Sequence, residues 1–218
     1  MSRLHRKSWA ASTPSLGALF LALAFFSLAA PPASAGQPSP AEAKKFIESL
    51  AARALQTLRG QGEALEQREA EVRSLMAEGF ALNFIARFSL GQHWRTASKE
   101  QRADYEKAFR EFFLRTYATR LGGYHGEKFF VDGAAPAGSE DVMVNSHIVP
   151  TDGQPIKAAW RVRMFDGKLK IIDIVVEGVS MALNQRQEFG SVVSRDGMAA
   201  LLEMLRARAQ RLPAQAPS

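Results

Sequence analysis

Cysteine is absent from this 218-residue chain. No disulfide can therefore stabilise it, and its stability has to come from packing. Metal ligands are also scarce, because residues 36–218 hold three histidines and none has a second histidine or a carboxylate at a metal-binding spacing. The chain lacks the G-x-S-x-G motif, the P-loop and a G-x-G-x-x-G followed by a suitable helix. The sequence therefore predicts neither an enzyme nor a metal or cofactor site.

The chain also lacks a strong excess of positive or negative charge, and it has few long apolar runs. The formal net charge is +6, and it falls to +3 without residues 1–35. Basic residues at this low excess, dispersed along the chain, argue against a nucleic-acid partner. No apolar stretch beyond the N-terminus is long enough to cross a membrane.

The N-terminus has the three zones of a secretory signal. Three basic residues (Arg3, Arg6 and Lys7) precede an apolar run over 16–28, and Ala33-Ser34-Ala35 supplies the small residues of a cleavage site. The run is short for a hydrocarbon core of about 30 Å. We predict a signal peptide over 1–35, cleaved after Ala35; the alternative is an uncleaved anchor.

Two amphipathic helices are predicted after the signal. Ser39-Pro40-Ala41-Glu42 has the pattern of a capping box at a helix start. The helix that follows ends at Gly60 and Gly62, and a second apolar face with helical spacing runs over 65–76. The apolar face of the first helix holds Phe46, Ile47, Leu50, Ala54, Leu55 and Leu58.

An aromatic helix follows. An apolar segment over 80–95 ends near Gly91, and a second capping box, Ser98-Lys99-Glu100-Gln101, opens the strongest helix of the chain. Gly122-Gly123 stops it. Its apolar stripe includes Tyr105, Phe109, Phe112, Phe113 and Tyr117.

The pattern then changes to a period of two. Strands are predicted over 128–131, 142–149, 156–165 and 169–176, with Asp166-Gly167 as a two-residue hairpin turn. Helices are predicted over about 181–193 and 196–210. Helices, then a meander of strands, then helices indicate an α+β fold with an antiparallel sheet covered on one face.

The hairpin turn also predicts a register. It pairs Met164 with Leu169, Val162 with Ile171 and Trp160 with Asp173, unless a bulge shifts the outer rungs. Trp160, Val162 and Met164 then face inward, and Val175 shares their face. Asp173 is interpreted as a cross-strand ion-pair partner of Arg161 or Arg163.

The apolar side chains have two possible uses. An aromatic helix laid across a curved sheet makes a cone, which side chains either fill or leave open as a ligand cavity. Composition does not decide between a filled core and an open pocket.

Three stretches of the chain resemble the MlaC family, the toluene-tolerance auxiliary proteins. They are Phe88-x-Leu90-Gly91-x-x-Trp94-Arg95, the aromatic helix ending in Tyr117, and the run from Trp160-Arg161 to Asp173-x-x-x-Glu177-Gly178-Val179-Ser180-Met181. The resemblance extends from about residue 40 to residue 208, in the family's order.

This resemblance implies an NTF2-like or cystatin-like α+β fold with an apolar pocket between sheet and helices. It also implies a periplasmic carrier that holds the acyl chains of a glycerophospholipid and helps to maintain outer-membrane lipid asymmetry. Its implied partners are an outer-membrane lipoprotein–porin complex and an inner-membrane MCE-protein/ABC transporter complex. Phospholipid is then the cargo, with no cofactor, and residues 36–212 form one lipid-binding domain before a polar tail over 213–218.

The resemblance assigns residue roles as well. Gly91 ends a short helix, Trp94-Arg95 locks it against the next one, and Ser180 caps the C-terminal helix. None of these roles is catalytic. The lipid-binding residues are expected to be Phe84, Phe88, Phe109, Phe113 and Tyr117 on the helical wall, and Val142, Val144, Trp160, Val162 and Met164 on the sheet wall.

Three alternatives stay open. A hopanoid-associated member of the same family would carry a polycyclic lipid. An NTF2-like isomerase or hydratase would use Asp173 as an inward carboxylate, and a periplasmic adaptor would have a filled core.

Overall fold

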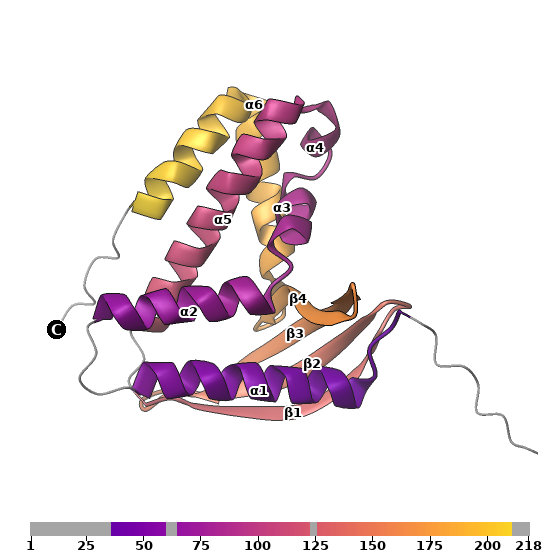
Figure 1. Ribbon diagram of the computed structural model, residues 1–218, viewed down its shortest axis with the longest axis vertical. Helices are drawn as coiled ribbons and strands as arrows, with labels where there is room; N and C mark the ends of the chain where they lie inside the picture. Colours follow the sequence, from indigo (N-terminus) through magenta and orange to yellow (C-terminus); the bar gives the residue numbers. More distant parts are fainter. Residues whose placement is uncertain (1–35, 60–64, 123–125, 211–218) are drawn as a thin grey trace, which may run out of the picture. The chain divides into compact units, whose positions relative to one another are not determined.

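The computed structural model describes residues 36–59, 65–122 and 126–210. The predicted signal peptide, the predicted helix breakers Gly60, Gly62 and Gly123, and the predicted tail over 213–218 lie outside these residues. The elements, shown in Figure 1, are α1 (Pro40–Arg59), α2 (Leu65–Gly79), α3 (Leu82–Leu90), α4 (His93–Thr96), α5 (Lys99–Gly122), β1 (Lys128–Ala137), β2 (Asp141–Val149), β3 (Ile156–Phe165), β4 (Lys168–Val176), β5 (Val179–Ser180) and α6 (Met181–Gln210).

Both predicted capping boxes are present. At the start of α1 the Glu42 amide donates to the Ser39 hydroxyl (3.2 Å), and the Ser39 amide donates to the Glu42 carboxylate (2.9 Å). Ser98 and Gln101 make the same reciprocal pair before α5, at 3.2 and 2.9 Å. Each pair satisfies two amides that the first helical turn leaves free, which fixes where the helix begins.

The sheet is an antiparallel meander in the order β1-β2-β3-β4-β5, which confirms the predicted fold class. Asp166 (φ 47°) and Gly167 (φ 74°) both have positive φ, as a type I′ hairpin turn requires. Glu177 (φ 47°) and Gly178 (φ 81°) repeat this turn between β4 and β5.

The predicted register is right up to Val162 and wrong beyond it. Val162 pairs with Ile171 as expected, but the next rung pairs Arg161 with Asp173. Ile172 is therefore an extra residue, a β-bulge in β4. Trp160 consequently lies opposite Ile174 and not Asp173. Val175 pairs with Ala159 and so lies on the face of the sheet opposite to that of Trp160.

The ion pair predicted for Asp173 is also wrong. Arg161 and Arg163 instead bind Asp141 of β2, with N–O distances of 2.7 and 2.5 Å. Burial alone would raise the pKa of the Asp141 carboxyl, but the hydrogen bonds from Arg163 and Arg161 outweigh it and hold that pKa below its ordinary value. Asp173 accepts hydrogen bonds from the Ser180 hydroxyl and the Ala182 amide, at 2.5 and 2.9 Å, and so fixes the start of α6.

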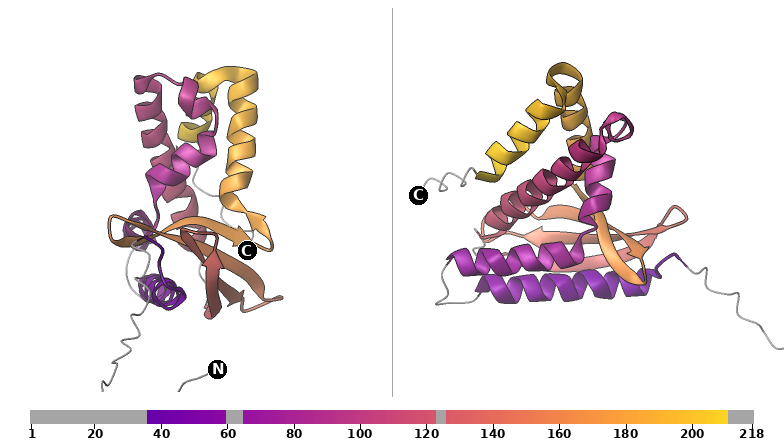
Figure 2. Two further views of the ribbon diagram at one scale, coloured as in Figure 1. Left: turned by 90° about the vertical axis from the view of Figure 1, so that its right-hand side faces the viewer. Right: turned by 45° about the horizontal axis from the view of Figure 1, so that its top comes forward.

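The helices form two groups that α2 joins. α5 packs against α6 and α3, and α1 lies over β1 and β2, while α2 packs on both α1 and α5 (Figure 2). Gly197 has non-helical backbone angles (φ 83°, ψ 173°) and divides α6 into two helical pieces. The sequence predicts two helices here, but it places the break over 194–195, before Gly197.

Candidate functional site

A cavity of about 460 Å³ lies between the two helix groups and the inner face of the sheet. α1 and α2 form one wall, the C-terminal half of α5 forms the second, and the sheet with the start of α6 forms the third. Its apolar lining comprises Ile47, Leu50, Ala51, Ala54, Leu55, Leu58, Val72, Leu75, Met76, Phe80, Ile85, Phe109, Phe113, Tyr117, Phe129, Ile148, Pro150, Ile156, Trp160, Ile172, Ile174, Met181 and Ala182.

The wall from α1 owes part of its shape to small side chains. Residues 47, 50, 51, 54, 55 and 58 recur at the helical period and so line one face. Two of them, Ala51 and Ala54, end at Cβ, so this face leaves space where a Leu or Phe would fill it.

Aromatic rings form much of the other two walls. Phe113 and Tyr117 of α5 lie with ring centroids 4.8 Å apart, and Phe129 of β1 meets Trp160 of β3 edge to face at 6.0 Å. The Trp160 indole donates to the Ser146 hydroxyl at 2.9 Å, and that hydroxyl donates to the Ala158 carbonyl at 2.9 Å. Because its only donor is satisfied inside the sheet, Trp160 can present an apolar ring to the cavity.

Few polar residues reach the lining. They are Glu127, Lys128, Asp173 and Gln185. The Asp173 carboxylate is already bound to the start of α6, so it is not free to act as a base there. Such a cavity suits an apolar ligand, held by shape and by exclusion of water.

Four of the ten predicted lipid-binding residues line the cavity: Phe109, Phe113, Tyr117 and Trp160. The structure places the other six outside this lining. Val142, Val144 and Val162 are fully buried in the core, and Met164 pairs with Leu169 near the hairpin turn. Phe84 packs on Phe165 with Arg163 above it, and Phe88 lies under Arg186.

The largest group that the site prediction left out comes from α1 and α2. The apolar periodicity of both helices is visible in the sequence, and it places these residues on an inward face. What could have identified a cavity wall is the pair of alanines on that face, since small residues on a long amphipathic helix leave room beside it.

The structural roles predicted for Gly91, Trp94 and Ser180 are confirmed. Gly91 has φ 60° and ends the helix, its amide donating to the carbonyls of Arg87 and Phe88. The guanidinium carbons of Arg87 of α3 and Arg102 of α5 lie 5.0 and 5.4 Å from the centroid of the Trp94 ring, so Trp94 joins the two helices. The Ser180 hydroxyl accepts the Leu183 amide at 3.1 Å, so Ser180 caps α6 as predicted.

Among residues 36–59, 65–122 and 126–210, no cluster of three or more His, Asp or Glu side chains is arranged to bind a metal ion. None of the helices in these ranges combines the length and apolar character needed to span a membrane.

Comparison with known proteins gives concordant matches. A family model described as "MlaC protein" matches residues 48–207. The intermembrane phospholipid transport system binding protein MlaC of Haemophilus influenzae is 25% identical over 126 residues, which are 56% of this chain and 59% of that protein. The chain therefore aligns with less than two thirds of that relative's length.

A solved structure has the same fold. It is a phospholipid-binding protein from Ralstonia solanacearum in complex with a phospholipid, and it superposes with a TM-score of 0.67 at 22% sequence identity. The match covers 79% of this chain and 99% of that one. At this identity the likeness establishes the fold and nothing more.

Proposed function

The chain belongs to the MlaC family, and on that premise we propose that it is a periplasmic phospholipid carrier. It takes up lipid in the cavity between α1, α2, α5 and the sheet. It exchanges that lipid with an outer-membrane lipoprotein–porin complex and an inner-membrane MCE-protein/ABC transporter complex, and so helps to maintain outer-membrane lipid asymmetry. The proposal includes removal of residues 1–35 as a signal peptide, leaving a binding domain over 36–212 and a polar tail.

The observation that carries this proposal is the size and apolar lining of the cavity. Water inside such a lining finds few hydrogen-bond partners, because only four of the lining residues are polar. An apolar ligand that displaces this water gains about 25 cal/mol for each Å² of apolar surface that is buried. The fold therefore favours a state with the cavity occupied by an apolar ligand.

Acyl chains supply the matching energetics. Each methylene moved from water to an apolar site gains roughly 0.8 kcal/mol, so a long chain is held strongly without head-group chemistry. The names of the Haemophilus influenzae relative and of the Ralstonia solanacearum structure support phospholipid as the cargo. The polar lining supports a non-enzymatic role, because the Asp173 carboxylate is bound to the start of α6.

Native mass spectrometry of the protein purified from the periplasm tests the proposal. We expect a mature chain beginning at Gly36 with one diacyl phospholipid, released and identified by gentle dissociation. A sterol-like mass would establish the hopanoid-carrying alternative instead. A mass without lipid, unchanged after incubation with phospholipid vesicles, would refute the carrier.

A further inference from the structure

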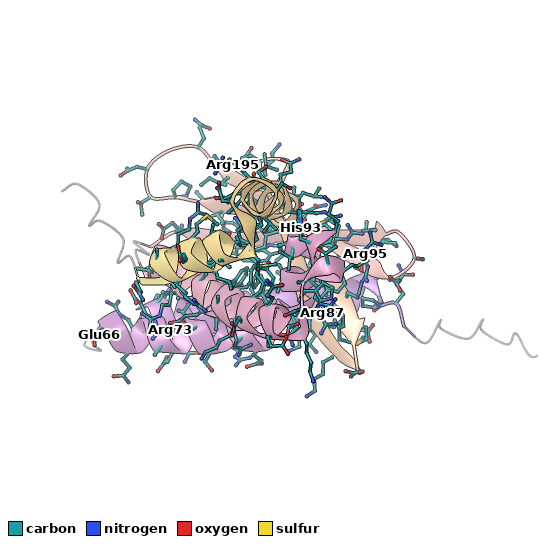
Figure 3. All side chains as sticks on the ribbon, turned by 90° about the horizontal axis from the view of Figure 1, so that it is seen from above. Glu66, Arg73, Arg87, His93, Arg95 and Arg195 are labelled. Atoms are coloured by element: carbon teal, nitrogen blue, oxygen red, sulfur yellow. The ribbon has the colours of Figure 1, made fainter. Side chains whose placement is uncertain are left out.

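Four arginines surround the turn that joins α3 to α5, away from the cavity. Arg87 and Arg102 both lie on the Trp94 ring, and Arg102 also donates to the Arg95 carbonyl at 3.1 Å. Arg186 reaches over from α6 and lies on Phe88, with its guanidinium carbon 5.1 Å from the ring centroid. We call these four residues the arginine corner; Figure 3 shows Arg87 and Arg95 from above, beside the labelled His93.

Basic residues outnumber acidic ones around this turn. Residues 82–106 contain Arg87, Arg95, Lys99 and Arg102 and three acidic residues, Glu100, Asp104 and Glu106. Glu100 is bound to the hydroxyl of Ser98, which belongs to the cap of α5. Arg186 of α6 adds a further positive charge, so the formal excess is +2.

Most of this charge is not neutralised within the protein. Arg87 meets Glu106 at 3.2 Å but keeps 58% of its side chain exposed. Arg95 and Arg186 are exposed, and no ion pair joins either to a carboxylate among the described residues. The corner therefore presents guanidinium groups whose fork-shaped donors are free to bind carboxylates.

Three of the four side chains are held in place. The guanidinium groups of Arg87 and Arg102 lie on Trp94 and that of Arg186 lies on Phe88. These contacts restrict the side-chain rotamers before a partner binds. Arginine beside a large aromatic ring is also the composition typical of binding hot spots.

We propose that the arginine corner is the docking surface for an acidic face of a protein partner. A protein, and not a bilayer, fits because none of the four arginines contributes to the cavity lining. A protein can hold the carrier by this corner and leave the cavity walls free to open, and its acidic charge would speed the encounter.

The proposal rests on the proposed carrier function, so the test measures docking and cargo separately. The probes are the purified lipoprotein–porin complex and the purified MCE-protein complex, each immobilised and titrated with the mature protein at low and high ionic strength. The test variant is R95E/R186E. Its control is R110E/R206E, which reverses the same charge at two exposed arginines outside the corner.

We expect R95E/R186E to bind at least one complex about tenfold more weakly or worse, with a flatter salt dependence, while the control binds like the wild type. Equal binding by both variants would overturn the proposal. So would a loss confined to vesicles of phosphatidylglycerol and phosphatidylethanolamine, since the corner would then meet a membrane. Native mass spectrometry of all three proteins reports the cargo: lipid missing from all of them would refute the carrier function and not the docking surface.

Discussion

The aromatic stripe of α5 has different surroundings at its two ends. Tyr105, Phe109 and Phe112 are at most 4% exposed and all contact Phe189 of α6, although Phe109 also reaches the cavity. Phe113 and Tyr117, nearer the C-terminus of α5, remain partly exposed and line the cavity. The first part of the stripe belongs mainly to a filled core and the second part to the wall of a site.

The difference lies in the side chains opposite the stripe and not in α5 itself. α6 places Phe189 against Tyr105, Phe109 and Phe112, whereas across the cavity α1 presents Ala51 and Ala54. Large side chains that face large ones fill the space between them, whereas large side chains that face small ones leave part of it empty. An aromatic stripe alone therefore does not distinguish a core from a binding site; the residues opposite it do.

Removing the filling ring should have the largest effect. We expect F189A to lower the free energy of unfolding by about 3–5 kcal/mol, because it empties a fully packed site. F113A should cost clearly less, because its ring already borders a void. Urea unfolding of lipid-free protein measures both; equal losses would mean that the two halves of α5 are packed alike.

A larger side chain on the α1 wall should reduce the space that the cavity offers to lipid. A54F places a ring in the cavity beside α1, and we expect it to weaken lipid retention about tenfold, a change of roughly 1.4 kcal/mol. A52F, on the exposed side of the same helix, is the matched control. Lipid bound per protein after transfer from vesicles is the readout, and full occupancy in A54F would place the lipid elsewhere.

The two helix caps allow a smaller and more selective test. S39A and S98A remove the same capping hydroxyl from α1 and from α5, and each should lower Tm by about 2–4 °C. Only S39A loosens a cavity wall at its start, so only S39A should speed lipid transfer to acceptor vesicles. Equal transfer rates would show that α1 does not limit lipid release.

Fluorescence should give the smallest signal. Residues 36–218 contain two tryptophans, Trp94 in the arginine corner and Trp160 in the cavity wall. Lipid loading should shift the emission of a W94F variant, which keeps Trp160, and leave that of W160F unchanged. A shift in W160F would mean that loading reaches the corner.

Local signals predicted much of the fold. The capping boxes at Ser39 and Ser98 and the turn at Asp166-Gly167 depend on residues three or fewer positions apart, so the sequence contains their whole cause. The stripe of α5 is equally local. These features fix where elements begin, end and reverse.

The bulge and the cavity depend on contacts distant in sequence. Ile172 is one apolar residue among several in β4, and only pairing with β3 makes it the extra one. Likewise, Val142 and Val162 have inward positions like that of Trp160, but they lie where helices cover the sheet and not where the cavity is. Alternation predicts the face of a strand residue, whereas the depth of cover above it depends on the helices.

The bulge at Ile172 also determines which changes in chain length β4 can accept. Deleting Ile172 would join Ile171 directly to Asp173 and keep every rung that β3 makes now, at the loss of one side chain from the cavity wall. Deleting Lys170 would instead move Ile171 one rung along, opposite Arg163, and expose it on the outer face. Among relatives, single-residue gaps in this strand should therefore fall at the bulge, and longer insertions should fall in the loop over 151–155.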